Sequence, residues 1–390
     1  MEKAISTEKI PIKMWLEQIE EGAMNQARNL ANLPFAFKHL CLMPDAHSGY
    51  GMPIGGVLAT KSVIIPNAVG VDIGCGMCAV KSNLHNEELP IEKIKSILSK
   101  IREVVPLGFE HQIERQDESL MPQGHNIDEL KIVKNQYLSA LKQIGTLGGG
   151  NHFIEIQKDQ NGFIWIMLHS GSRNIGLKVA EYYDNKAKKL NSLWCSTVNP
   201  KADLAFLPFE TEEARQYYNE MKYCVEFAYS NRTLMMNRIL DIFRNSFSAI
   251  EFEPIINIAH NYASWEKHFE EKVLVHRKGA TSAKLGEIGI IPGSQGTKSY
   301  IVEGLGNPES FMSCSHGAGR VMSRSQAIKT LNLEDETRKL DEQGIIHAIR
   351  KKSDLDEATS AYKNISEVMD FQKDLVKIKF ELSPLAVIKG

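Results

Sequence analysis

The sequence lacks three features that would each assign it to a particular class of protein. None of its apolar runs approaches the ~20 residues needed to cross a bilayer. The charged segment 1–20 has no apolar stretch followed by a small-residue cleavage site, as a signal peptide would. Its six cysteines are scattered, without the spacing of a disulfide framework. We therefore expect a cytoplasmic protein with no membrane contact and no disulfide bonds.

The sequence also lacks a surplus of positive charge. Its 46 lysine and arginine residues are balanced by 48 aspartate and glutamate residues, which gives a net charge of −2. Because non-specific binders of nucleic acid usually carry a basic surplus, any nucleic-acid site in this chain has to be a local basic patch. The 390 residues are 43% hydrophobic and 24% charged, which is an ordinary globular composition and enough chain for a large core.

Helix-like and strand-like segments alternate irregularly along the chain. Apolar residues at three- and four-residue spacings, or charged helical patterns, predict helices at 12–31, 88–105, 128–143, 211–245 and most of 325–376. Short apolar runs bounded by glycine or polar residues predict strands at 56–59, 78–81, 162–168 and 385–388, with strand and turn at 287–302. Since no regular strand–helix–strand rhythm appears, we expect a mixed α+β fold rather than a doubly wound sheet.

Five of the twelve histidines lie in segments rich in glycine, asparagine or arginine: His47, His152, His169, His260 and His316. Before His152, a run of glycines can bring backbone N–H groups close to a phosphate, although a tight turn explains that run equally well. His169 ends the apolar run 162–168, as expected of a strand that delivers a residue to a site. Taken alone, His260 is more simply explained as a buried histidine satisfied by a hydrogen bond.

Cys75 and Cys78 form a CxxC pair, and Asp72 precedes it by three residues. A single CxxC leaves zinc, a redox pair and coincidence all open, because no second pair completes a zinc site. The small-residue turns at 170–173 and 292–299 resemble phosphate-binding turns, but the second does not match the spacing of a P-loop. A hairpin or loop is the simpler interpretation of both turns.

His316 stands among small residues, with Arg320 and Arg324 close by in sequence. An accessible imidazole beside cationic side chains suits nucleophilic attack on phosphorus, provided that a partner fixes the ring tautomer. Histidines with a cysteine and an aspartate can bind one or two transition metals. Metal, phosphate-binding turns and a nucleophile together indicate phosphoryl or nucleotidyl transfer.

Long strings in the sequence resemble the RtcB family of RNA ligases. They are MPDAHSGYGMPIGG (43–56), VGVDIGCGM (69–77), LGGGNHFIEI (147–156), LHSGSRNIG (168–176), HRKGA (276–280), IPGSQGTKSYIVEGLGN (291–307) and SCSHGAGRVMSR (313–324), together with the C-terminal Lys389-Gly390. The resemblance extends from about residue 10 to the end. It implies one RtcB-like catalytic domain spanning 1–390, whose site is assembled from distant segments and for which a monomer is sufficient.

The resemblance also implies roles for individual residues. His316 would be the nucleophile that becomes guanylated, and Asp45 would orient its other ring nitrogen. Two Mn²⁺ ions would be bound by Asp72, Cys75, His152, His169 and His260. The GTP pocket would be lined by Asn151, Glu155, Ser294, Ser299, Ala318, Tyr362 and Lys389. Phosphates of GTP or RNA would be contacted by Arg173, Lys278, Arg320 and Arg324.

The implied activity joins an RNA 3′-phosphate or 2′,3′-cyclic phosphate to a 5′-hydroxyl, through a histidine–GMP intermediate and an RNA(3′)pp(5′)G end. It would serve tRNA splicing or RNA repair, with archease as a candidate activating partner. Manganese comes from the resemblance alone, because a cysteine with three histidines would by ligand softness suggest zinc or cobalt.

The chain departs from the family pattern at Gly149, Ala259 and Thr359-Ser360, none of which is an expected site residue. Cys78 is not part of that pattern, so we interpret the CxxC as coincidental. One rival function is a metal-dependent RNA phosphoesterase or cyclic phosphodiesterase, but it would need neither His316 nor a GTP pocket. The other, a non-catalytic RNA-binding protein, predicts a basic and aromatic-rich surface that this sequence does not suggest.

Overall fold

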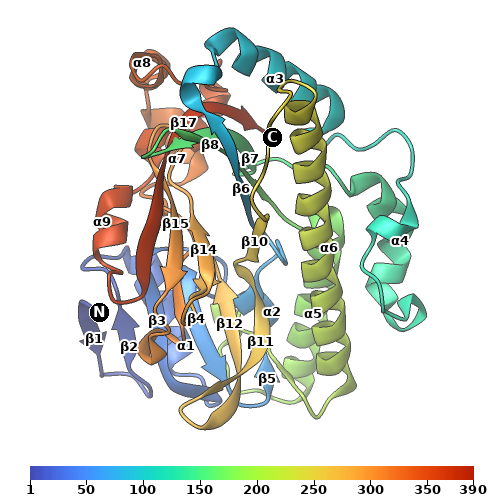
Figure 1. Ribbon diagram of the computed structural model, residues 1–390. Helices are drawn as coiled ribbons and strands as arrows, with labels where there is room; N and C mark the ends of the chain where they lie inside the picture. The colour runs from blue at the N-terminus through green and yellow to red at the C-terminus, as the bar shows by residue number, and fades with distance from the viewer.

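Two β-sheets form the centre of the computed structural model, which describes all 390 residues (Figure 1). The six-stranded sheet has the order β1 (Lys3–Ile5), β2 (Ile12–Met14), β3 (Ala36–His47), β4 (Ile54–Thr60), β12 (Glu271–Lys278) and β11 (Asn261–His268). The seven-stranded sheet has the order β10 (Ile256–Ala259), β6 (Gly76–His85), β8 (Phe163–Ser170), β7 (Phe153–Asp159), β17 (Val376–Lys389), β15 (Ser299–Gly304) and β14 (Ile288–Ile291).

Two short strand pairs lie beside these sheets. They are β13 (Ala280–Ser282) with β16 (Ser313–Ser315), and β5 (Val63–Ile64) with β9 (Leu207–Pro208). The larger sheet is antiparallel throughout, whereas β2 and β3 pair in parallel in the smaller one. The helices are α1 (Glu21–Ala31), α2 (Pro66–Val69), α3 (Ile91–Val104), α4 (Lys131–Gln143), α5 (Arg173–Leu193), α6 (Glu212–Arg244), α7 (Arg324–Thr330), α8 (Leu333–Glu342) and α9 (Ile365–Asp370).

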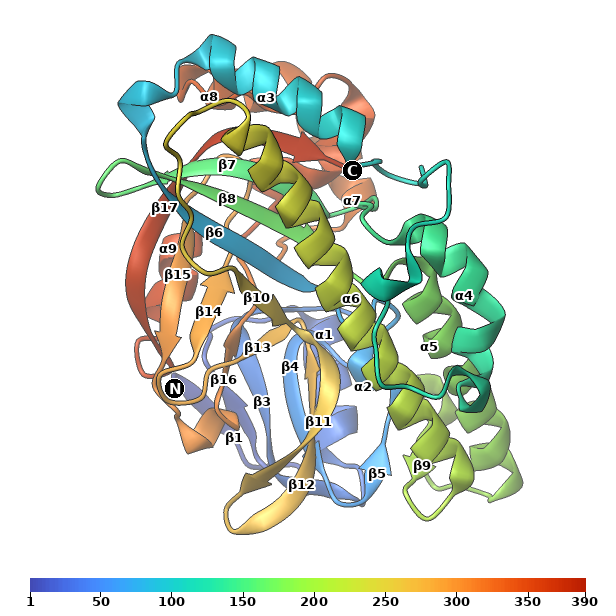
Figure 2. The ribbon, with the colours of Figure 1, turned by 45° about the vertical axis from the view of Figure 1, so that its right-hand side comes forward.

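Helix α6 links the two sheets. It runs past β6 and β10 of the larger sheet toward β11 and β9, with α5 and α4 packed on its outer side (Figure 2). Its Tyr217 and Phe227 belong to one hydrophobic cluster, whereas Met235 and Phe243 belong to another. Because 16 of its residues are buried, this 33-residue helix is stabilised by tertiary packing along most of its length.

The expected α+β fold is confirmed, as are most of the expected elements. Helices were expected at 88–105, 128–143 and 211–245, where α3, α4 and α6 occur. Strands were expected at 56–59, 78–81, 162–168 and 385–388, where β4, β6, β8 and the end of β17 occur; β14 and β15 account for 287–302. None of the helices is both long and apolar enough to traverse a bilayer.

Two helix predictions were wrong in extent. The segment 12–31 begins as strand β2, whose alternating burial and parallel pairing with β3 outweigh the helical pattern, so helix α1 starts only at Glu21. The segment 325–376 is divided into α7, α8 and α9 with 3₁₀ turns between them. Asn332 and Asn364 cap new helix starts with their side chains, and Gly344 follows α8 with φ of +71°.

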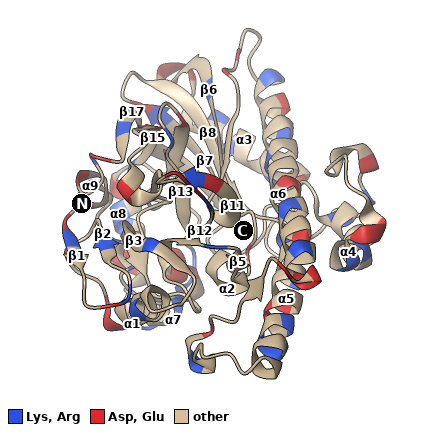
Figure 3. Ribbon diagram, turned by 90° about the horizontal axis from the view of Figure 1, so that it is seen from below, with Lys and Arg blue, Asp and Glu red and all other residues tan.

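Charged residues of both signs are interspersed over the surface. Blue and red segments alternate along α5 and α6 when the molecule is seen from below (Figure 3). This mixture agrees with the small net charge of the chain. Any basic site for an anionic ligand is therefore local and does not extend over a whole face of the molecule.

Candidate active site

Strand pairing brings four potential metal ligands to one end of the seven-stranded sheet. His169 in β8 is opposite Met77 of β6 on one side and Phe153 of β7 on the other. Cys75 and His152 each directly precede one of those neighbouring strands. His260 follows β10, which pairs with the start of β6 through Ala259 and Gly76. The antiparallel register therefore assembles residues that are far apart in sequence.

Cys75 is shared by two clusters of potential metal ligands. One cluster joins it to His169 and His260, the other to Asp72 and His152, and the ligand atoms within each lie within 4.8 Å of one another. The Cys75 Sγ atom is 3.1 Å from Nε2 of His169 and 3.5 Å from Nε2 of His152. His152 Nε2 lies 3.2 Å from Asp72 Oδ2, and the Nε2 atoms of His169 and His260 are 3.3 Å apart.

His169 and His260 are in the neutral form that metal binding requires. Burial lowers the pKa of His169 and of His260 well below the usual range, so both imidazoles are neutral. The Nδ1 atom of His169 lies 3.2 Å from the Asn151 carbonyl, to which an Nδ1–H would donate, leaving the Nε2 lone pair toward Cys75. Burial, and next Asp72, raise the pKa of the Cys75 thiol, and a bound cation would reverse that effect. The donor set therefore fits one or two transition-metal ions.

His316 and Asp45 form a pair beside this cluster. Nδ1 of His316 lies 2.6 Å from Oδ2 of Asp45, and the same oxygen accepts the backbone N–H of His316 at 3.1 Å and of Gly317 at 3.3 Å. Asp45 is fully buried, and the His316 ring centre is 4.8 Å from that of His260. Since Nδ1 is engaged, Nε2 is the ring nitrogen left for chemistry. Gly319, with φ of +75°, permits the close approach, because a Cβ atom there would lie 2.2 Å from the Asp45 carbonyl oxygen.

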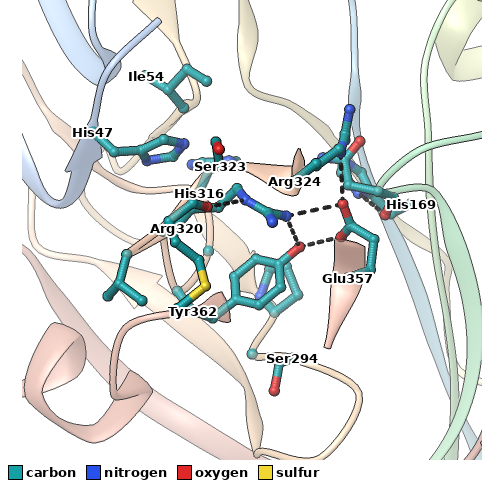
Figure 4. Close-up of a pocket in the computed structure, with 18 of the residues that line it drawn as sticks. His47, Ile54, His169, Ser294, His316, Arg320, Ser323, Arg324, Glu357 and Tyr362 are labelled. Atoms are coloured by element: carbon teal, nitrogen blue, oxygen red, sulfur yellow. Dashed lines mark hydrogen bonds and ion pairs between the residues drawn. The ribbon is translucent and has the colours of Figure 1, made fainter. Parts of the chain in front are cut away.

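A cavity of about 570 Å³ opens beside His316 (Figure 4). Its wall contains ten of the residues expected in the site: Asn151, Glu155, His169, Ser294, His316, Ala318, Arg320, Arg324, Tyr362 and Lys389. These residues come from the turns and strands around β7, the turn after β14, the segment after β16, the 3₁₀ region before α9, and the end of β17. The structure thus brings together segments as far apart in the sequence as Asn151 and Lys389.

Three expected phosphate or GTP contacts lie outside the cavity wall. Ser299 is buried, and its hydroxyl accepts the backbone N–H of Gly293 and a Gln157 N–H, so it supports the turn that carries Ser294. Arg173 donates to Thr146 and to the Gly108 carbonyl.

Lys278 is also turned away from the cavity. Its buried ammonium donates to the carbonyls of Tyr50 and Asn67, at 2.5 and 2.9 Å. Burial lowers the pKa of this lysine to about 7. Lys278 therefore supports the loop carrying Tyr50, which does line the cavity.

Glu357 is a charged residue of the cavity wall that sequence reasoning missed. Its buried carboxylate accepts hydrogen bonds from Arg320 at 3.0 Å, Arg324 at 2.9 Å and the Tyr362 hydroxyl. Glu357 lies in a charged run, KKSDLDE, which has the composition of a solvated surface. Only its nearness to Tyr362 in the sequence could have drawn attention to it.

The sequence of this chain is similar to a known family and to named proteins of bacteria, archaea and eukaryotes. Residues 26–390 match the family model described as "tRNA-splicing ligase RtcB". The chain is 40% identical to "RNA-splicing ligase RtcB" of Escherichia coli (strain K12), over 99% of each chain. It is 31% identical to "tRNA-splicing ligase RtcB" of Thermococcus kodakarensis, over 95% of this chain and 92% of the relative. It is 33% identical to "RNA-splicing ligase RtcB homolog 1" of Entamoeba dispar, over 95% and 82%.

Proposed function

The chain belongs to the RtcB family, and on that premise we propose that it is a GTP-dependent RNA ligase. Its substrates would be RNA ends carrying a 3′-phosphate or 2′,3′-cyclic phosphate and RNA ends carrying a 5′-hydroxyl. The observation that carries the proposal is the pairing of His316 with Asp45, between the cysteine–histidine cluster and the cavity.

His316 is the proposed nucleophile. Asp45 accepts the Nδ1 proton, which leaves the Nε2 lone pair free to attack the α-phosphorus of GTP. A P–N bond forms to Nε2 and the bond to pyrophosphate breaks. The buried Asp45 also stabilises positive charge on the ring, as a carboxylate does for a catalytic histidine.

Two further displacements complete the proposed reaction. An oxygen of the RNA 3′-phosphate attacks the phosphorus on His316, the P–N bond breaks, and the RNA end becomes RNA(3′)pp(5′)G. A 2′,3′-cyclic phosphate is hydrolysed before this step: water attacks the phosphorus, the bond to the 2′-oxygen breaks, and a 3′-phosphate and a 2′-hydroxyl result. The 5′-hydroxyl oxygen of the second RNA then attacks the 3′-phosphorus and GMP leaves, so that GTP cleavage drives the condensation.

The residues that would hold the two metal ions are Asp72, Cys75, His152, His169 and His260. Bound ions would neutralise phosphate charge beside His316. Manganese is proposed from the family resemblance, since the donor set itself also suits zinc or cobalt.

The nucleotide is proposed to lie in the cavity between these ligands and Lys389. Glu155, Asn151, Ser294, Ala318 and Tyr362 would surround it, and Arg324 would contact phosphate. Arg320 has one N–H left for phosphate after its contacts with protein groups. Arg173, Lys278 and Ser299 would act behind the cavity wall, on the loops that carry its residues.

A ligation assay tests the proposal. Purified protein, Mn²⁺ and GTP are incubated with one RNA bearing a labelled 2′,3′-cyclic phosphate end and a second bearing a 5′-hydroxyl. A parallel reaction contains archease. We expect a longer RNA product whose label resists phosphatase and whose formation requires GTP. The protein would instead be a phosphoesterase if both reactions, with no need for GTP and without joining, converted the cyclic end to a monoester that phosphatase removes.

A further inference from the structure

Glu357 occupies a central position among the cationic residues of the cavity. It ends the 3₁₀ segment Lys352–Glu357, and its side chain is 4% exposed. Figure 4 shows its carboxylate facing Arg320, Arg324 and Tyr362. Lys389 also lies near this carboxylate, with Nζ 3.7 Å from Oε2.

The carboxylate remains ionised at neutral pH. Burial alone would raise the pKa of Glu357, but Lys389, Arg324, the Tyr362 hydroxyl and Arg320 outweigh that effect and lower it. Because three cationic side chains surround this buried carboxylate, it stays charged. Removing its charge would leave the three cations without a shared anionic partner.

Arg320 and Arg324 use this carboxylate differently. Arg320 donates to Glu357 and to three further acceptors, namely the Tyr362 oxygen and the carbonyls of Met322 and Asp356. Four of its five N–H groups are therefore taken by the protein, and Arg320 braces Glu357 and Tyr362.

Arg324 donates only its Nε–H, to Glu357. Its side chain is 50% exposed, and neither terminal nitrogen has a protein acceptor. NH2 lies beside the Gly150 turn, where an added Cβ atom would be 3.2 Å from it. That turn directly precedes Asn151 and the potential metal ligand His152.

We propose that Glu357 is a positioning residue for nucleotide binding, which aims the two terminal nitrogens of Arg324 at the polyphosphate of the nucleotide. The inference rests on the proposed function and adds a residue to it. A simpler alternative is that Glu357 merely fills an anion site and is expelled by phosphate. The hydrogen bonds of Glu357 argue against this alternative, because displacing the carboxylate would break its bonds to Arg320 and Tyr362 at the same time.

The two alternatives predict different results for one measurement, the affinity of Glu357→Gln for a nucleotide analogue. The probe is the α,β-methylene analogue of GTP, which cannot transfer its α-phosphate, and its Kd is measured by calorimetry with Mn²⁺ present. If Glu357 positions Arg324, Glu357→Gln weakens binding by about tenfold, the size of one lost charge-assisted hydrogen bond. If Glu357 is a placeholder, the same variant binds the analogue as tightly as wild type or more tightly.

A double-mutant cycle separates positioning from a general structural role. Arg324→Ala should weaken binding by a similar factor, and the double variant should bind no more than about twofold worse than either single variant. Multiplicative losses would overturn the inference. Glu266→Gln is the matched control, since Glu266 is a buried carboxylate paired with Arg277 outside the cavity wall, and it should leave Kd unchanged.

A second variant keeps the inference testable if Glu357→Gln does not fold. If Glu357→Gln does not fold, Arg324→Lys keeps the charge at a half-exposed position but lacks Nε, and it should bind as weakly as Arg324→Ala. Wild-type affinity in Arg324→Lys would overturn the inference. Wild-type protein that does not bind the analogue would overturn the proposed function itself, whereas normal binding by wild type and by Glu357→Gln would overturn only the positioning role.

Discussion

His316 and Asp45 are 271 positions apart in the sequence, and their side chains meet at a distance of 2.6 Å. The contact joins the turn after β16 to strand β3, and backbone N–H groups of His316 and Gly317 point at the same carboxylate oxygen. The ring orientation is thus fixed by three donors to one buried acceptor. This relationship determines which imidazole nitrogen is left free to react.

Asp45→Asn should slow transfer of GMP to the protein by about 10²–10⁴, because an amide no longer holds the Nδ1 proton or stabilises the charged ring. The measurement is the single-turnover rate of protein labelling by α-labelled GTP. Asp159→Asn is the control, since Asp159 is also buried but accepts bonds only from its own hairpin and Trp165. Wild-type labelling by Asp45→Asn would show that the pair does not set the reactivity of His316.

The number of metal ions bound should depend on which ligand is removed, because Cys75 belongs to both clusters. We expect Cys75→Ala to lose both ions, His260→Ala to lose one and Asp72→Ala to lose the other, as measured by elemental analysis after dialysis. Cys78→Ala is the matched control, because Cys78 is packed in a hydrophobic cluster and should leave metal content unchanged. Loss of metal in Cys78→Ala would reverse our interpretation of the CxxC as coincidental.

Adjacent glycines in the turn before His152 should respond differently to alanine. Gly148 has φ of +94°, and a Cβ atom there would lie 2.1 Å from Arg173 NH1 and 2.5 Å from His152 Nδ1. Gly148→Ala should therefore cost at least about 1–2 kcal/mol of stability and displace His152. At Gly149 the nearest atom to an added Cβ is 3.8 Å away, so Gly149→Ala should be tolerated. Urea unfolding and metal titration of both variants test this, and equal effects would contradict it.

Glu155 should give the protein a distinctive dependence of stability on pH. Burial raises its pKa to about 8 from an ordinary value of 4.5, although Lys389 and Gln157 oppose the shift. Between roughly these two values the folded state keeps a proton that the unfolded state has lost. The contribution of Glu155 is therefore complete below pH 4.5 and declines as pH rises toward 8.

The test compares wild type with Glu155→Gln, both stripped of metal. The free energy of unfolding of wild type relative to the variant should fall as pH rises from 5 to 8, a direction set by linkage. A difference that is independent of pH would mean that Glu155 is ionised in the folded protein. Glu220→Gln offers a comparison at a buried carboxylate remote from the cavity, whose pKa burial also raises.

The spacing of apolar residues along the sequence predicted those helices and strands in which buried side chains recur at regular intervals or form a continuous run. Helix α6 has apolar residues along a continuous buried face, and strand β8 is an apolar run that ends at His169, so both were predictable. Strand β2 was missed because three residues are too few for a period and its stability comes from pairing with β3. The order of strands in the sheets depends on contacts across more than 200 residues, such as β17 with β7, which no local pattern encodes.

Some features of the candidate site could also be predicted from the sequence, whereas others could not. The glycine-flanked histidines could be selected from sequence because their neighbours are unusual, but their convergence was known only from the family resemblance. Lys278 is a residue type expected to contact phosphate, yet tertiary packing turns its side-chain nitrogen to two carbonyls. Glu357 was missed because the three cations that surround it come from other segments of the chain.

The most direct test of the account asks whether GMP becomes attached to His316. Purified protein is incubated with Mn²⁺ and GTP labelled on the α-phosphate, quenched, and examined for acid-labile label, which is then located by mass spectrometry of peptides. If His316 is the nucleophile, the label lies on the peptide containing His316 in wild type and is absent from His316→Ala, which should retain its metal. Label on another residue, or His316→Ala protein that still ligates RNA, would contradict the central claim.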